Sequence, residues 1–480
     1  MQNEILGYTE EKLKNLCEDI ITQSKKLGAE SAEVDVSIAS GKNLTVRNED
    51  VETFEINNDK NVTLTLYQNG RKSVVSSSDF SKKTIQHLID NSLNMLKVTE
   101  QDPYFGIVKQ DLHPKKRRPV DIFYPQELSF DDMLEIAKKT ESSAKSYDER
   151  ITNSEGATIN YSSSIFMYAN SNQFFGGFPG SRYSLYCSVI GSKDQTMQRS
   201  YDYSNVRDFR DLKNPTQLGQ EAAKNTIDRL NVKKIKTGNY PIIFHNTISD
   251  AIINPILSAI SGRNLYRQNS FLLDTIGTKI ASDKLTISEK PLLIKGHAST
   301  YFDDEGVEVF DNTLVDQGIL NRYLLSNYSA KKLNLATTGN AGGTHNLIFE
   351  HHNISLAQMI KDINKGFLIT ELLGHGVNMV NGDFSRGAAG LYIENGEIQH
   401  AVEEITIAGN LKDMVMDIVS IADDANSNSS KYIGSDGRRQ GPHRRVPAQA
   451  GRDAGLTRSR SGTHQSEATG ATVAAQHLRA

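Results

Sequence analysis

The sequence lacks the long apolar runs and the cysteine content that mark membrane-spanning and disulfide-stabilised proteins. A helix that crosses a bilayer needs ~20 mostly apolar residues, and no run approaches that length. Residues 1–5 show neither the basic region nor the apolar region of a secretory signal. The two cysteines, Cys17 and Cys187, are too few for a disulfide framework in 480 residues and suit a reducing compartment. These absences predict a cytoplasmic protein with no membrane partner.

The sequence also lacks the zinc-binding patterns HExxH and HExxxH. A hydrolytic zinc site needs three protein ligands and an open position for water, and two histidines one helical turn apart usually supply the chelating pair. His351 and His352 are adjacent, so their side chains point apart in a strand or a helix. His400 lies shortly before a pair of glutamates, but the alternation of residues 404–407 predicts a strand, in which residues three apart face opposite ways. We therefore expect no catalytic metal ligands and no bound cofactor in this chain.

The composition is that of a soluble globular protein, with 37% hydrophobic and 23% charged residues and a mean hydropathy of −0.47. The chain is long enough for two or three domains. Its net charge is −4, but residues 436–480 hold eight Arg, two Asp and one Glu, a net of +5. The rest of the chain therefore sums to −9 (−4 minus +5), which gives no general reason to expect a nucleic-acid partner. The short basic run Lys115–Arg118 is interpreted as a solvated loop.

The segment 436–480 differs in composition from the rest of the chain. It has no Ile, Phe, Tyr, Met or Lys, while Arg, Ala, Gly, Gln and Ser dominate. Such a segment buries too little apolar area to offset the entropy lost on ordering, so we predict a disordered basic tail. The change from Lys to Arg usage also fits an origin outside the family of the body, for example translation from an altered reading frame.

Residues 1–237 are predicted to form an N-terminal α+β domain of mixed helices and antiparallel strands. Apolar residues recur at helical spacing from about Thr9 to Leu27 and again over about 79–97. Between these helices apolar and polar residues alternate, and Asn69-Gly70 between two alternating runs is a strong hairpin signal. No strand–helix–strand alternation is sustained, so the α+β class is favoured over a parallel-sheet fold.

Residues 238–435 are predicted to form a β-rich C-terminal domain. A buried strand over Pro241–Phe244 and a helix over about 250–261 are followed by many short strands separated by Gly, Asn and Asp. In the first half, Gly176–Gly180 is predicted to be a turn or loop, and it lacks the Lys-Ser/Thr of a phosphate loop. The acids Asp303–Glu305, followed by glycine, are interpreted as a solvated turn and not as a cation site.

Motifs spread along the second half together resemble the zinc-less PmbA/TldE branch of the TldD/PmbA metallopeptidase family. Each motif is weak alone, but their order and spacing are specific, and the resemblance covers roughly residues 10–435. The motifs are AISGR at 259–263, SFL at 270–272, FDDEGV at 302–307, GNAGGTHN at 339–346, TELLGHGVN at 370–378, NGDFSRGAAG at 381–390, ENGEI at 394–398 and ITIAGNL at 405–411.

The resemblance implies a two-domain protein that pairs with a TldD-like subunit as a heterodimer. In that family the TldD-like subunit supplies two histidines and a glutamate to zinc, and the complex degrades peptides and unfolded chains in the cytoplasm. The TldE-like subunit is thought to complete the enclosed chamber. Members also end with a further strand, whereas here Tyr432-Ile433-Gly434 gives way to the Arg-rich segment. The last strand is therefore expected to be missing, which would leave a sheet edge unpaired.

Candidate substrate-binding residues lie within these motifs. An arginine can hold a peptide carboxylate or carbonyl through paired N–H groups, and neighbouring glycines let a chain approach closely. A salt bridge is the alternative role for Arg263. The candidates are Arg263, His345, Gly374, His375, Gly376, Asp383, Ser385 and Arg386.

Three functional hypotheses follow from the sequence. The first is a non-catalytic subunit that binds peptide as an extended strand while a TldD-like partner supplies zinc. The second is a self-associating peptide-binding or scaffold protein with no role in proteolysis. The third is an independent hydrolase that uses His375, Asp383 and Ser385, although Ser385 lacks the Gly-x-Ser-x-Gly context of a nucleophile elbow.

Overall fold

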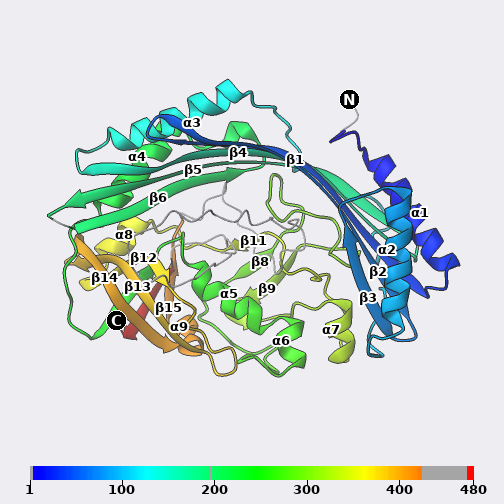
Figure 1. Ribbon diagram of the computed structural model, residues 1–480. Coiled ribbons are helices and arrows are strands. Elements are labelled where there is room, and N and C mark those ends of the chain that lie inside the picture. The colour runs from blue at the N-terminus through cyan, green and yellow to red at the C-terminus, as the bar shows by residue number, and fades with distance from the viewer. Residues whose placement is uncertain (1–3, 195, 424–472, 480) are drawn as a thin grey trace.

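A computed structural model describes residues 4–194, 196–423 and 473–479 and confirms the α+β class. The N-terminal part is a six-stranded antiparallel sheet in the order β3-β2-β1-β4-β5-β6, which curves into an arch over the C-terminal part (Figure 1). Its strands are β1 (Ser31–Arg47), β2 (Asp50–Gln68), β3 (Arg71–Ser77), β4 (Ile151–Asn170), β5 (Phe174–Lys193) and β6 (Thr196–Val206).

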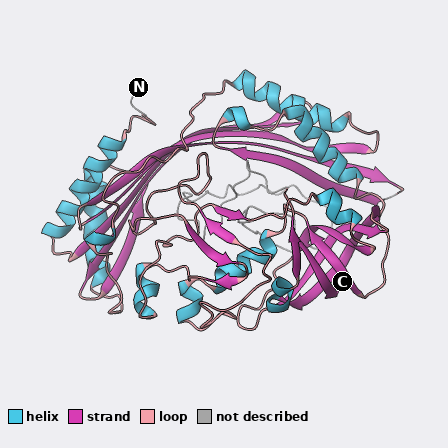
Figure 2. Ribbon diagram, turned by 180° about the vertical axis from the view of Figure 1, so that it is seen from behind, coloured by secondary structure: helices cyan, strands magenta, loops and turns pink. Residues whose placement is uncertain are grey.

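Four helices cover the outer face of the arch in two pairs, as the reverse view shows (Figure 2). The helices α1 (Glu10–Lys26) and α2 (Lys82–Leu96) lie at one end, and α3 (Phe130–Lys145) and α4 (Pro215–Ile227) at the other. Polar N-caps begin them: Thr9, Ser81, Ser129 and Asn214 each accept a backbone N–H of the first turn. Short 3₁₀ turns lie at Gln110–Leu112 and Phe209–Asp211.

Each helix pair closes its own apolar core against the sheet. Ile20 of α1 and Ile89 of α2 pack on Val34 of β1, whereas Leu185 of β5 packs beneath α3 and α4. Because side chains alternate along a strand, the residues between these buried ones face the concave side. The face opposite the helices is the one turned toward the C-terminal part (Figure 1).

The strand β1 runs without a break through Gly41, where a Cβ would lie 2.6 Å from the Tyr161 carbonyl oxygen of the neighbouring strand. One sequence prediction about a strand is wrong. Gly176–Gly180 is not a turn but the start of β5. A Cβ on Gly176 would lie 2.6 Å from Cε1 of Phe302, so this glycine serves close packing within a strand.

The C-terminal part contains two sheets, and its short strands agree with the β-rich pattern of the sequence. One sheet has the order β10-β9-β8-β11 and the other β14-β13-β12-β7-β16-β15. The strands are β7 (Asn239–Phe244), β8 (Ile287–Glu289), β9 (Asn312–Asp316), β10 (Ile319–Leu320), β11 (Leu347–Phe349), β12 (Lys365–Leu373), β13 (Asp383–Glu394), β14 (Glu397–Asn410), β15 (Ile418–Ile421) and β16 (Val473–Arg479).

Short helices complete the C-terminal part and share its main core. They are α5 (Asp250–Ala259), α6 (Gly262–Tyr266), α7 (Asn327–Lys332), α8 (Leu356–Lys361) and α9 (Leu411–Met416). The core joins α5 to both sheets through residues such as Ile256, Leu314 and Phe367. None of the helices in the described ranges is both long and apolar enough to span a bilayer.

The strand expected to be missing at the C-terminus is present. Val473–Arg479 forms β16, which lies antiparallel between β7 and β15 and also meets β14 through Arg479 and Ala408. The pairing is made by backbone groups, and a strand ladder requires no particular side chains, which is why composition did not reveal it. The remainder of the predicted tail, 436–472, lies outside the described residues.

A loop of the C-terminal part docks into the arch and corrects another prediction. Asp303 is buried, not solvated, and its carboxylate accepts hydrogen bonds from the backbone N–H groups of Glu305, Val307 and Ala341 at 2.9 Å each. The preceding Phe302 is fully buried among aromatic rings of β4 and β5. This loop fixes the C-terminal part under the arch.

Candidate functional site

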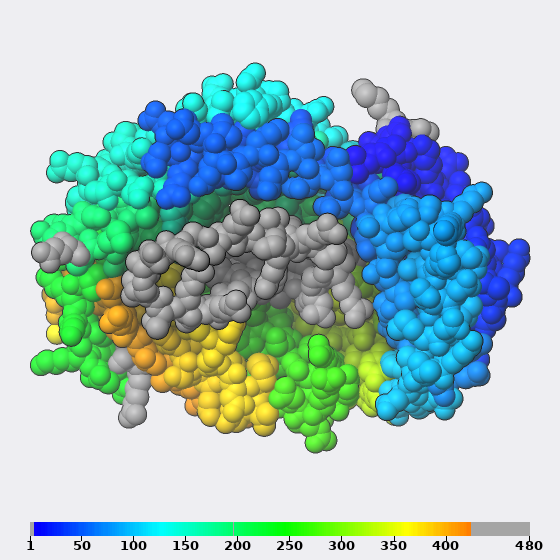
Figure 3. All heavy atoms as spheres, in the orientation of Figure 1, coloured from blue at the N-terminus to red at the C-terminus, as the bar shows by residue number. Residues whose placement is uncertain are grey.

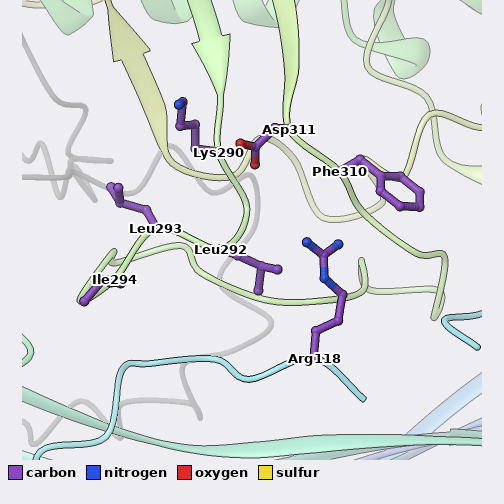
Figure 4. A pocket seen from close by; sticks show the side chains of 7 residues that line it. All are labelled: Arg118, Lys290, Leu292, Leu293, Ile294, Phe310 and Asp311. Atoms are coloured by element: carbon purple, nitrogen blue, oxygen red, sulfur yellow. The ribbon is translucent and has the colours of Figure 1, made fainter. Parts of the chain in front are cut away.

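A pocket of about 620 Å³ opens on the C-terminal part beside the linker from α2 to α3 (Figure 4). Its walls combine aliphatic and aromatic side chains with two cationic side chains and one acid. They are Leu292, Leu293, Ile294, Phe310, Arg118, Lys290 and Asp311. The pocket is open to solvent and combines apolar surface with cationic N–H donors and one carboxylate.

Strand ends position the charged side chains of the pocket. Lys290 directly follows β8 and Asp311 directly precedes β9, and these two strands pair antiparallel. The guanidinium of Arg118 donates to the Val309 carbonyl oxygen at 3.1 Å and lies 5.8 Å from the centre of the Phe310 ring. Arg118 is thereby held at the pocket with most of its N–H groups still available as donors.

A buried carboxylate directly precedes Lys290 in the chain. Glu289, 1% exposed, accepts the His345 backbone N–H at 2.6 Å and faces the His345 ring, with Nδ1 at 3.0 Å. The side-chain amides of Asn312 and Asn340 donate to the same carboxylate at 2.8 and 3.0 Å. Burial opposes the charge of Glu289, but these bonds outweigh it and lower its pKa to about 2. The cluster fixes the ends of β8 and β9 from which Lys290 and Asp311 project.

Among the predicted site residues, His345 is therefore the one that belongs to the Glu289 cluster beside the pocket. It is buried, with its ring turned to Glu289. Arg263 is exposed in the short helix α6. The other predicted residues lie in the turn from β12 to β13 and in the first residues of β13.

That turn is shaped by its glycines. Gly374 has a φ of +73°, which L-residues with side chains rarely adopt. A Cβ on Gly376 would lie 1.6 Å from the Ser385 carbonyl oxygen, and Ser385 in return donates its N–H to the Gly376 carbonyl at 2.7 Å. His375 between them is exposed. The turn presents His375 to solvent at the end of a tightly paired hairpin.

The side chains of this hairpin are divided between two faces. Asp383 and Ser385 alternate with Arg386 along β13, so Arg386 faces away from them, and its Nη2 lies 3.4 Å from the Leu372 carbonyl oxygen. Burial lowers the pKa of the Arg386 guanidinium. Asp383 accepts from the amides of Asn381 and Asn410, and within the described ranges no hydrogen bond joins it to His375. A Ser/His/Asp relay is not assembled here.

The described residues do not fit a zinc site. Within these ranges, no group of three His, Cys, Asp or Glu side chains is arranged to hold a metal ion. The helix α5 buries Ile252, Ile253, Ile256 and Leu257 and contains Pro255, so its inward face offers hydrocarbon and no ligands.

Sequence reasoning missed the pocket itself. Arg118 was interpreted within a solvated basic run, and Lys290 and Phe310 belong to no recognised motif. The available signal was Glu289, an acid in the alternating segment 287–289, because a carboxylate on the buried face of a strand must find partners.

Comparison with known proteins finds similar sequences among proteins described as metalloproteases. Three family models match it: PmbA/TldA metallopeptidase domain 1 at residues 32–96, the central domain at 123–230 and the C-terminal domain at 237–448. Metalloprotease PmbA of Escherichia coli O157:H7 is 38% identical over 428 residues, which cover 88% of this chain and 95% of that protein. A TldD homolog of Buchnera aphidicola is 23% identical over 46% of this chain and 48% of its own length.

Solved structures share the fold over almost the whole chain. A putative modulator of DNA gyrase from Bacteroides thetaiotaomicron superposes with a TM-score of 0.86 at 26% identity and covers 98% of this chain and 99% of its own. TldE from Thermococcus kodakarensis superposes with a TM-score of 0.78 at 19% identity, covering 97% and 99%. At 19% identity, the similarity to TldE from Thermococcus kodakarensis supports the fold alone.

Proposed function

Because this chain belongs to the PmbA/TldD metallopeptidase family, we propose that it is the accessory subunit of a cytoplasmic peptidase complex whose TldD-like subunit supplies the zinc. In this proposal the chain contributes a wall of the chamber and holds extended peptides or unfolded chains, while bond cleavage takes place on the partner's metal. No metal-dependent step is assigned to residues of this chain.

One observation carries the proposal: a chain that matches three family domains has, within its described residues, no group of three side chains that could hold a metal ion. The three family models together span residues 32–448. The inward face of α5 is aliphatic, and Pro255 removes a backbone donor within the helix. A family fold without its ligand set supports a role in substrate binding or assembly, and not in metal chemistry.

The pocket beside β8 and β9 is suited to hold part of the peptide. Leu292, Leu293 and Ile294 offer hydrocarbon to a side chain, and Arg118 and Lys290 offer N–H donors to a carbonyl or a terminal carboxylate. Ile294 is 68% exposed, so its side chain is accessible to a ligand. We infer that this pocket binds an apolar residue next to the carboxylate end of a peptide.

The pocket assignment predicts a loss of peptide affinity in the variant Ile294→Asp. Burying an isoleucine side chain contributes ~1.5–3 kcal/mol, so removing it and adding a repelling charge should weaken binding roughly tenfold or more. The probe is a fluorescein-labelled peptide rich in Leu and Val with a free carboxylate, followed by anisotropy. Ile398→Asp is the matched control, since Ile398 is 46% exposed on β14 outside the pocket. Equal loss in both variants would contradict the assignment.

If this chain is the accessory subunit, proteolytic activity should appear only when it is mixed with a TldD-like subunit. We expect the purified chain to bind no stoichiometric zinc and to leave an unfolded, alkylated protein intact. Addition of a TldD-like subunit should give chelator-sensitive cleavage, with zinc confined to that subunit by metal analysis of the separated chains. Chelator-sensitive cleavage by this chain alone, or zinc near one per chain, would overturn the accessory role.

A further inference from the structure

Three asparagines of this chain, Asn69, Asn381 and Asn395, are followed directly by glycine. Such a pair is chemically labile, because glycine has no side chain to hinder attack of its backbone nitrogen on the asparagine side chain. All three asparagines are exposed in the structure, so exposure does not distinguish them. What differs among them is the hydrogen bonding of the two groups that react.

Two of the three glycine nitrogens are held in backbone hydrogen bonds. The Gly382 N–H donates to the Asn378 carbonyl oxygen at 2.8 Å, and the Gly396 N–H donates to the Ile363 carbonyl oxygen at 2.9 Å. Each of these bonds must break before the nitrogen can reach the asparagine side chain. The reaction at both pairs therefore has to wait for a local opening of the fold.

The pair between β2 and β3 differs from the other two. Within the described residues, neither the Gly70 N–H nor the Asn69 side-chain amide takes part in a hydrogen bond. The Asn381 side chain, in contrast, donates to the Asp383 carboxylate at 2.7 Å and accepts the Asp383 N–H at 3.0 Å. The structure thus leaves one of the three pairs with neither reacting group held by a hydrogen bond.

We propose that Asn69 is a site of spontaneous deamidation in the folded chain. The Gly70 nitrogen loses its proton to solvent and attacks Cγ of Asn69, the side-chain nitrogen leaves as ammonia, and a cyclic succinimide forms. Water then opens the ring: opening at Cγ gives aspartate, and opening at the backbone carbonyl carbon gives isoaspartate, in which the main chain runs through the former side chain. Water is consumed and ammonia is released, so the step requires no oxidant or reductant.

Isoaspartate does not fit the turn that it would occupy. Asn69 and Gly70 have positive φ, 50° and 68°, as in a two-residue hairpin turn, and the flanking Gln68 and Arg71 pair with each other. Isoaspartate lengthens the main chain by a carbon atom, so the ends of β2 and β3 no longer meet in this register. Either product also adds a negative charge beside the Glu30 carboxylate, which accepts the Asn69 N–H at 2.9 Å.

The same turn holds the linker that follows α2. The Gly70 carbonyl oxygen accepts the Asp102 N–H at 2.7 Å, and the Asn69 carbonyl oxygen accepts the Gln101 side-chain amide at 3.1 Å. The Asp102 carboxylate accepts the hydroxyl of Tyr328 in α7 at 2.8 Å. In Figure 3 the blue surface at this end of the arch borders the yellow-green surface of the region that includes α7. Deamidation at the turn therefore weakens a contact between the arch and the C-terminal part.

Ageing of the purified full-length chain in mildly alkaline solution tests the site, since alkaline solution favours loss of the Gly70 proton. Trypsin separates the three pairs into different peptides, which span residues 61–71, 366–386 and 387–412. In the folded chain we expect Asn69 to deamidate about tenfold or more faster than Asn381 or Asn395, and to take up heavy oxygen from labelled water. In urea the fold no longer distinguishes the pairs, and the three rates should be similar.

Asn69→Gly is the matched variant, because Gly-Gly keeps this kind of turn and removes the reactive amide. After the same ageing, the parent should acquire a fraction with a lower melting temperature in proportion to its isoaspartate at position 69, whereas the variant should melt as before. Equal rates at the three pairs of the folded chain, or a faster rate at Asn381 or Asn395, would overturn the assignment of the site. A melting temperature that stays constant as isoaspartate accumulates at position 69 would overturn its effect on the contact with α7.

Discussion

Replacing Phe302 by alanine is expected to lower the free energy of unfolding by ~3–5 kcal/mol, the range found when a fully buried aromatic residue is truncated. Phe302 is 0% exposed. Its ring centre lies 4.7 Å from that of Tyr301, 5.2 Å from Phe174 and 6.0 Å from Phe178. Two of these partners belong to β5, whereas Phe302 belongs to the docking loop, so the cavity would open where the two parts of the chain meet.

The measurement is urea unfolding of Phe302→Ala beside Phe310→Ala. Phe310 is 58% exposed, so its truncation should cost less than ~1 kcal/mol. The Gly176 position explains why little relaxation can refill the cavity: Phe302 already lies against the backbone of β5, and no side chain stands there to move in. Equal destabilisation by the two variants would show that the aromatic cluster does not hold the loop of the C-terminal part against the arch.

Local sequence signals were sufficient for the elements of the N-terminal part. Thr9 begins its helix as predicted, and the Asn69-Gly70 turn joins β2 to β3. The continuous length of the strands was not predictable. A glycine such as Gly41 weakens a strand and often marks its end. Here Gly41 stays within β1, where the neighbouring strand approaches too closely to leave room for a Cβ.

The candidate site was predictable only in part, because a motif identifies residues but not the side chains that surround them in the fold. The motif containing His375 and Ser385 was found from sequence, but strand alternation turns Arg386 of the same motif to the opposite face. Glu289 and His345 lie 56 positions apart and meet only because β8 pairs with β11. Long-range pairings of short strands leave no local pattern in one sequence.

The docking loop also brings acids together at the joint between the two parts. The Tyr168 hydroxyl of β4 lies 3.1 Å from the Glu33 carboxylate of β1 and 3.1 Å from the Glu305 carbonyl oxygen. Burial raises the pKa of Glu33. Burial, and then the charge of Asp303, raise the pKa of Glu305. Burial raises the pKa of Asp303 as well. Asp303 accepts three backbone N–H groups, whereas among the described residues the Glu305 carboxylate accepts that of Asn327 alone, so Glu305 is the better site for a shared proton.

A proton held by Glu305 makes stability fall as the pH rises. The folded chain keeps this proton to a higher pH than the unfolded chain, which loses it near the ordinary pKa of 4.5. The folded state therefore binds more protons between these two pKa values, and the stabilisation is complete below the unfolded one and lost as the pH rises through the folded one. The variant Glu305→Gln is neutral at every pH and should escape this loss.

The expected result is that the unfolding free energy of Glu305→Gln minus that of the parent grows from pH 5 to pH 8, by ~1.4 kcal/mol for each pH unit over which only the folded chain holds the proton. Taking the difference removes the contributions of histidines such as His297, whose lowered pKa acts equally in both proteins. Glu397→Gln, at an exposed position on β14, is the control and should give a constant difference. If the difference in unfolding free energy is constant for Glu305→Gln as well, Glu305 does not hold the proton. If the difference grows with pH, a protonated Glu305 stabilises the joint between the arch and the C-terminal part, and this stabilisation is lost in alkaline solution.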